Sequence, residues 1–229
     1  MRLKYAKHIN FGLFIIVALA IPVALVMFTK AGMHIFTRDV FALTKSPPIL
    51  GFLSNVGAFV WCASLSSIVL TIFTVRYNTS GTVMWFLYSS AIITGWLLFD
   101  DFFMLHDFWI KRIGMRSFHA YIGLGVALII YITIFFRIII KTNYLLFLLA
   151  FGFLSVSVAI DMGESLGFWQ DNDWRWYYLF EDGSKWIGIC FWAAYFFSTS
   201  RRVLIANFAD QLKRDDDPLG KASHSAQLR

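Results

Sequence analysis

The chain predicts an all-α fold, a polytopic membrane protein with a bundle of six transmembrane helices and both termini cytoplasmic. Hydrophobic residues make up 59% of the 229 residues and charged residues only 15%, against about 25% charged in an ordinary soluble domain. Six apolar segments approach the ~20 residues that a helix needs to cross a bilayer. The predicted spans are residues 11–31, 49–75, 83–105, 117–139, 143–167 and 177–199.

Polar or helix-breaking residues separate these segments. The first segment follows a basic N-terminus and lacks a small-residue cleavage site, so it is predicted to be a retained helix and not a signal peptide. Pro47 and Pro48 precede the second segment, and a polar turn at 76–82 precedes the third. The very short break at Lys141–Asn143 predicts that the fourth and fifth helices are adjacent and antiparallel.

The last part of the chain is predicted to leave the membrane. Leu204, Phe208 and Leu212 recur every fourth residue, which is the spacing of a short amphipathic helix. The polar stretch 214–229 is typical of a disordered tail. The sequence therefore predicts a transmembrane domain over 1–202, followed by a short amphipathic helix and cytoplasmic tail over 203–229.

The orientation follows from the basic residues, which are enriched on the cytoplasmic side of membrane proteins. With the N-terminus inside, twelve lysines and arginines face the cytoplasm and seven face outward, and Lys185 lies within the last segment. This bias favours both termini on the cytoplasmic side. The chain is expected to be a multi-pass protein of the cell inner (plasma) membrane. Because the basic residues are scattered over loops and one tail, no nucleic-acid partner is expected. The expected partners are membrane lipids and, alternatively, other membrane-protein subunits.

The acidic residues are the strongest indication of function, because under this topology all ten that precede Asp210 lie on one side of the membrane. They are Asp39, Asp100, Asp101, Asp107, Asp161, Glu164, Asp171, Asp173, Glu181 and Asp182. Ionisable groups at membrane depth are costly, so they usually pair with one another, line a wet cavity or bind a ligand. The ends of the third, fifth and sixth segments are thus predicted to share a site.

Helical spacing indicates which side chains share a face. If the third helix continues far enough, Asp100, His106 and Asp107 lie on one face and Asp101 points away. Asp161 and Glu164 are three residues apart on the fifth helix. Glu181 and Lys185 are four apart on the sixth and can pair directly, and His119 opens the fourth helix at the same level.

Carboxylates and imidazoles on facing helices are the ligands of metal sites in helix bundles. We expect a divalent metal, Zn, Mn or Fe, to be the cofactor if one is present. The candidate metal ligands are Asp100, His106, Asp107, Asp161 and Glu164. The candidate catalytic residues are Asp100 and His106 as acid or base, with Glu181 and Lys185 orienting the substrate. The chain has no His-Glu-x-x-His motif and no paired Glu-x-x-His motif.

Two stretches carry a resemblance to known families. Asp100-Asp101-Phe-Phe-Met-Leu-His106-Asp107 and Phe180-Glu181-Asp182-Gly-Ser-Lys185 resemble a group of uncharacterised bacterial multi-pass membrane proteins, which have an acidic pair followed by His-Asp or His-Glu at a helix end. The chain is more weakly similar to ceramidase-like membrane hydrolases, which place an aspartate and histidines around zinc at one membrane level. That similarity implies hydrolysis, although Glu181 and Lys185 stand in the last helix where those hydrolases have His-x-x-x-His.

Two classes of function follow. The first is a membrane enzyme, metal-dependent or acid-base, that acts on a lipid or other amphiphile at the outer membrane face. The alternative is a non-catalytic subunit or scaffold of a membrane complex, in which the charges form an ion-pair network that locks the helices together. A proton or ion carrier ranks last, because the middles of the six segments are nearly free of charge.

Overall fold

The computed structural model describes residues 44–47, 49–105, 117–165 and 174–216, with single residues at 20, 21, 24, 27, 112 and 114. It divides into two compact units, Met1–Leu50 and Gly51–Arg229. In the first unit, residues 20, 21, 24 and 27 are helical, and the Leu50 amide donates to the Pro47 carbonyl in a turn, at 3.0 Å. Most of the predicted first span, 11–31, lies outside the described residues.

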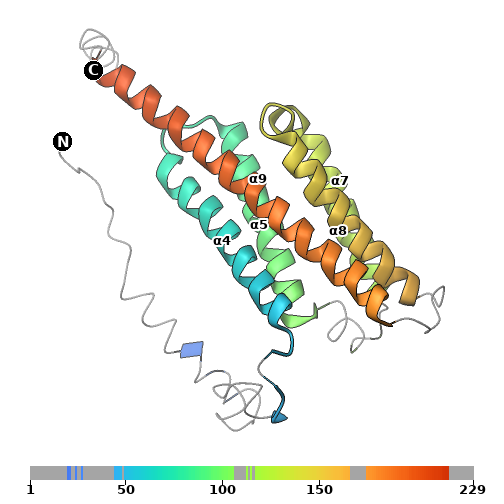
Figure 1. Cartoon of the computed structure of the whole chain (residues 1–229). Helices are drawn as coiled ribbons and strands as arrows, with labels where there is room; N and C mark the ends of the chain where they lie inside the picture. Colours follow the sequence, from blue (N-terminus) through green and yellow to red (C-terminus); the bar gives the residue numbers. More distant parts are fainter. Residues whose placement is uncertain are drawn as a thin grey trace. The chain divides into compact units, whose positions relative to one another are not determined.

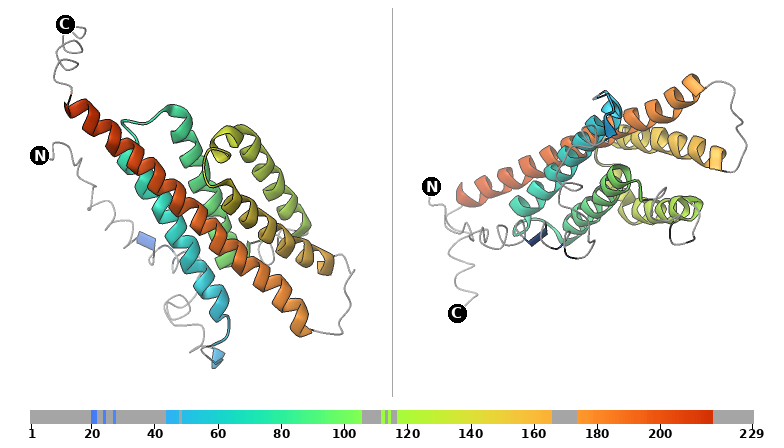
Figure 2. Two further views of the ribbon diagram at one scale, coloured as in Figure 1. Left: turned by 45° about the horizontal axis from the view of Figure 1, so that its top comes forward. Right: turned by 90° about the horizontal axis from the view of Figure 1, so that it is seen from below.

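The second unit is all-helical over its described residues. Its five helices are α4 (Phe52–Val75), α5 (Gly81–Phe103), α7 (Ser117–Ile139), α8 (Tyr144–Ser165) and α9 (Trp174–Asp216). Figure 1 shows α9 with α4 along one side and α8 along the other, where its most extensive packing lies. Two further views show that α5 lies beside α4 and α7 beside α8 (Figure 2), and a smaller contact joins α5 to α7. Each helix therefore packs against its neighbours in a closed ring.

Four of these helices are long and apolar enough to cross a membrane. They are α4, α5, residues His119–Ile139 of α7 and Tyr144–Gly163 of α8. Most of their surface is not covered by the chain itself, and large apolar side chains such as Phe59, Trp85 and Ile134 are exposed. Such a surface is stable in lipid and unfavourable in water. The structure thus confirms an all-helical protein with membrane-spanning character.

The second to fifth predicted segments agree with α4, α5, α7 and α8 to within three residues at each end. The last predicted segment, 177–199, is part of a much longer helix, because α9 continues without a break from Trp174 to Asp216. At about 1.5 Å per residue, 43 residues exceed the ~30 Å thickness of a bilayer core. The predicted amphipathic stretch is therefore the end of α9 and not a separate helix.

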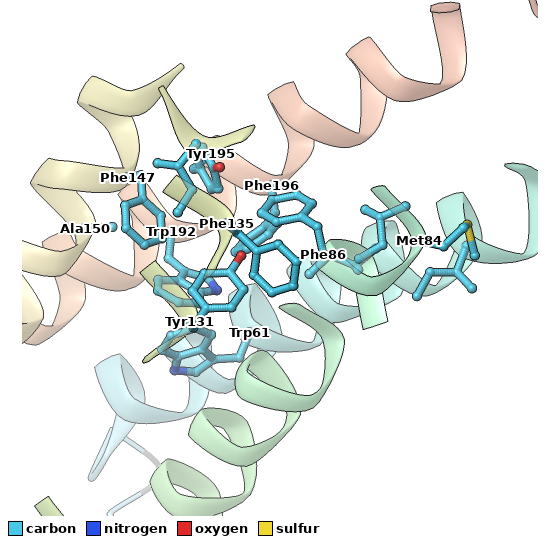
Figure 3. Close-up of a cluster of buried hydrophobic side chains, with 14 of the residues drawn as sticks. Trp61, Met84, Phe86, Tyr131, Phe135, Phe147, Ala150, Trp192, Tyr195 and Phe196 are labelled. Atoms are coloured by element: carbon cyan, nitrogen blue, oxygen red, sulfur yellow. The ribbon is translucent and has the colours of Figure 1, made fainter. Parts of the chain in front are cut away.

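Aromatic side chains from all five helices fill the centre of the bundle (Figure 3). Trp61 of α4 meets Trp192 of α9 edge to face, with 5.9 Å between ring centroids. Phe147 of α8 packs edge to face on Tyr195, at 5.1 Å. Buried polar atoms pair across helices: the Trp192 indole N–H donates to Thr94 Oγ1 at 3.0 Å. Packing and interhelical hydrogen bonds of this kind hold helices together in lipid.

The closest approach between α8 and α9 occurs at Gly188. A Cβ atom at this position would lie 2.7 Å from Leu154 Cγ and 3.0 Å from the Leu154 backbone nitrogen. Small residues at such crossings let helix backbones approach each other in membranes. The contact also fixes which residues of the antiparallel helices α8 and α9 lie at the same level.

We expect Gly188→Ala to destabilise the bundle by about 1–3 kcal/mol, because the added methyl would overlap backbone atoms of α8. Thermal unfolding of the detergent-purified protein measures the change. Gly152→Ala in α8 is the matched control, since nothing lies within 4 Å of a Cβ there. Equal melting temperatures for the two variants would contradict the packing described here.

Candidate functional site

An ion pair joins the end of α5 to the beginning of α9. The Lys185 ammonium contacts the Asp101 Oδ1 atom. The Asp101 side chain is only 5% exposed, whereas Lys185 is 37% exposed. Apart from Lys185, no residue in the described parts of the chain donates a hydrogen bond to either carboxylate oxygen of Asp101. A buried carboxylate in this position depends on its single cationic partner.

The helix α4 closes over this ion pair at Gly57. A Cβ atom on Gly57 would lie 3.3 Å from Ile189 Cδ1 and 4.0 Å from Asp101 Oδ2. The absence of a side chain at Gly57 therefore lets α4 approach both Asp101 of α5 and Ile189 of α9. Three helices meet at this point.

Other carboxylates surround the same ammonium. Asp100 and Asp182 lie near enough to Lys185 to interact with its charge, in addition to the direct partner Asp101. Counting only these described side chains, three ionised carboxylates and one ammonium leave two more negative charges than positive ones, with Asp101 buried, Asp100 half-buried and Asp182 exposed. Like charges in a low-dielectric setting do not all ionise without a compensating cation. The arrangement therefore favours an additional proton, cation or positively charged ligand.

A second polar contact joins α7 to α8. The Tyr121 hydroxyl donates a short hydrogen bond to Asp161 Oδ2. Asp161 lies seven residues after Leu154, and Glu181 lies seven residues before Gly188, so in antiparallel helices the two acids are at the same level. The described acidic residues of α5, α8 and the start of α9 are thus at one end of the bundle.

The predicted site residues are only partly described. Asp100, Asp161 and Glu181 are half-buried, and the Glu181 carbonyl accepts a hydrogen bond from Ser184 Oγ at 3.0 Å. His119 is exposed near the start of α7. Outside the described residues lie His106 and Asp107, and so does the side chain of Glu164, whose backbone belongs to α8.

The predicted metal site stays a prediction. Within the described segments, no three His, Cys, Asp or Glu side chains come close enough to hold a metal ion. Asp161, one of the expected ligands, instead accepts a hydrogen bond from Tyr121. Asp100 and Asp161 would need His106, Asp107 or Glu164 to complete a ligand set.

The structure adds a contact that helical spacing did not indicate. Lys185, for which spacing along α9 offers Glu181 as a partner, forms an ion pair with Asp101 of α5. Spacing along one helix cannot show which face its neighbours cover, so it missed Asp101, Gly57 and Tyr121. The available signal was Lys185 itself, a lone cation in an apolar segment that requires a buried acid.

Apolar helices of spanning length and a buried ion pair at one end of the bundle define a helical membrane protein. The chain belongs to the family described as a domain of unknown function (DUF8692), whose sequence model matches residues 12–199. The match extends from within the first predicted span to the middle of α9. Comparisons with curated proteins and with solved structures found no match.

We expect Lys185→Met to destabilise the fold by roughly 3 kcal/mol, the lower end of the range for buried pairs, since Lys185 is partly exposed. The cause would be the uncompensated carboxylate of Asp101. Adding Asp101→Asn to this variant should recover part of the loss, and thermal unfolding of the four proteins in a double-mutant cycle measures the coupling.

Lys213→Met is the control for this cycle, because it removes the same charge from an exposed position on α9. A coupling energy near zero between Asp101 and Lys185 would show that the ion pair contributes nothing to the fold.

Proposed function

We propose that the protein binds and chemically transforms a lipid or another amphiphile at the acidic end of its transmembrane bundle. The observation that carries this proposal is the group of three carboxylates that act on Lys185: Asp101 is buried and contacts the ammonium directly, Asp100 is half-buried and Asp182 is exposed. Several carboxylates around one cation at the end of apolar helices are typical of sites that hold a proton, a metal or a cationic group.

Asp100 is the residue best placed for chemistry. Asp100 is half-buried on α5, next to the buried Asp101. Its carboxylate is therefore accessible to a ligand while it still interacts with neighbouring side chains. A carboxylate in such surroundings can serve as a general acid or base. His106, which follows six residues later, is the second candidate for proton transfer, and Glu181 and Lys185 would orient the substrate.

In the metal-dependent version of the proposal, Asp100, Asp161, Glu164, His106 and Asp107 would hold Zn, Mn or Fe. Mixed carboxylate and imidazole donors suit these ions. A bound metal would activate water for hydrolysis or, if it is iron, support oxygen chemistry. Tyr121 would then orient Asp161 by donating a hydrogen bond to it, as outer partners of metal ligands do.

We expect Asp100→Asn to abolish lipid turnover or metal retention while leaving the melting temperature nearly unchanged, because Asp100 is not the buried partner of Lys185. The measurement combines metal content per chain with mass spectrometry of a lipid extract incubated with the purified full-length protein. Asp210→Asn, at an exposed position late in α9, is the control and should behave like the unmodified protein.

A non-catalytic subunit or scaffold of a membrane complex is the second candidate. It is favoured by the two polar contacts, Asp101–Lys185 and Tyr121–Asp161, each of which joins a pair of helices. If Asp100→Asn changes neither metal content nor turnover, and the Lys185→Met variant loses co-purifying subunits, the scaffold is the correct class.

The proposed setting is the cell inner (plasma) membrane with both termini in the cytoplasm, supported by the distribution of lysines and arginines. In a background with Cys62 and Cys190 replaced by Ala, we expect Ser46→Cys to react with an impermeant maleimide on intact cells. Ser80→Cys, in the turn between α4 and α5, should react only after permeabilisation. The reverse pattern would invert the proposed topology.

A further inference from the structure

The end of the bundle opposite the acidic site contains a hollow fixed in place by Arg202. The Arg202 guanidinium donates from Nη1 to the Lys141 carbonyl at 2.6 Å and from Nη2 to Asn143 Oδ1 at 3.3 Å. The Asn143 amide in turn donates a short hydrogen bond to Ser198 Oγ. The turn between α7 and α8 is therefore held against α9 by a defined polar network.

The hollow beside this network has a volume of about 250 Å³ and is open to the surface. Its lining consists of Asn143, Ser198, Arg201, Arg202 and Ile205. Two guanidinium groups, a hydroxyl and a carboxamide offer several N–H and O–H donors within one small volume. The planar guanidinium group of arginine donates two parallel N–H hydrogen bonds, which match the spacing of phosphate oxygens.

No acidic side chain of the described residues pairs with the arginines of the hollow. Arg202 bonds only to neutral acceptors, and Arg201 makes no hydrogen bond or ion pair with the described parts of the chain. Along α9, the next acidic residue is Asp210, eight positions after Arg202, or about 12 Å along the axis. Lys141 adds a further positive charge nearby. The hollow therefore favours an anion.

The position of the hollow relative to the membrane indicates which kind of anion it would bind. The apolar span of α7 ends at Ile139 and that of α8 begins at Tyr144, so the hollow lies where the hydrocarbon region ends. Exposed apolar side chains lie in the first turns of α8, on the membrane side of Asn143, among them Leu145 and Leu148, each 58% exposed. Basic pockets between helices at this level bind the headgroups of anionic lipids, while adjacent apolar surface accommodates the acyl chains.

We propose that this hollow binds the phosphate group of an anionic membrane lipid, with Arg201 as the principal ligand and Arg202 as a fixed second donor. General attraction of basic residues to the membrane requires only charge. This site also depends on a particular arrangement of donors: Arg202 is held in place by its hydrogen bonds to Lys141 and Asn143, beside the guanidinium of Arg201, which has no hydrogen-bond partner in the described parts of the chain. The proposal is independent of the acidic site, because no residue is shared between the two ends of the bundle.

The test is a lipid titration of the detergent-purified full-length chain, followed by native mass spectrometry. The probes are dioleoylphosphatidylglycerol, dioleoylphosphatidylcholine and inorganic phosphate. We expect phosphatidylglycerol to bind preferentially, and Arg201→Gln to weaken its binding about tenfold, the effect of losing a charge-assisted phosphate contact. Arg201→Lys, which keeps the charge without the fork, should lose less.

Arg137→Gln is the matched control. It removes the same charge from an exposed position near the end of α7, on the same side of the bundle as the hollow but outside its lining. Binding within about twofold of the unmodified protein is expected for it. Equal losses for Arg137→Gln and Arg201→Gln would overturn the site in favour of diffuse attraction. Equal binding of the two lipids would overturn headgroup recognition, and tight binding of inorganic phosphate alone would overturn a lipid as the ligand.

Discussion

The ion pair between Asp101 and Lys185 is the interaction on which the acidic end of the bundle depends. A carboxylate that is almost fully buried near the end of a transmembrane helix is costly unless a cation accompanies it. That requirement links α9 to the end of α5 through the side chains of Lys185 and Asp101, and Gly57 lets α4 approach both helices there. The position of three helices at this end thus follows from the need to compensate one charge.

The rest of the bundle is held by packing and interhelical hydrogen bonds, since lipid removes most of the hydrophobic drive for helices to associate. Aromatic rings such as those of Trp61 and Trp192 fill the centre, and Gly188 lets α8 and α9 approach closely. The outward faces stay apolar and exposed, as lipid requires. The charged side chains of the described helices lie toward the ends of the bundle, where binding and chemistry are possible.

The two ends have opposite chemical character. Among the described side chains, three carboxylates act on Lys185 at the end formed by α5, α8 and the start of α9, whereas Arg201 and Arg202 line the hollow at the other end. We infer that the acidic end attracts protons, metals or cationic groups and that the basic end anchors anionic lipid.

The sequence alone determined the helical membrane class, the approximate bounds of α4, α5, α7 and α8, and the gathering of acidic residues at helix ends. These features depend on hydropathy, turn residues and spacing, all of which are local. The tertiary structure decided which helices are neighbours, that α9 continues to Asp216, and that Asp101 instead of Asp100 is the buried partner of Lys185. Periodicity places residues on a face of one helix, but only packing between helices determines what that face meets.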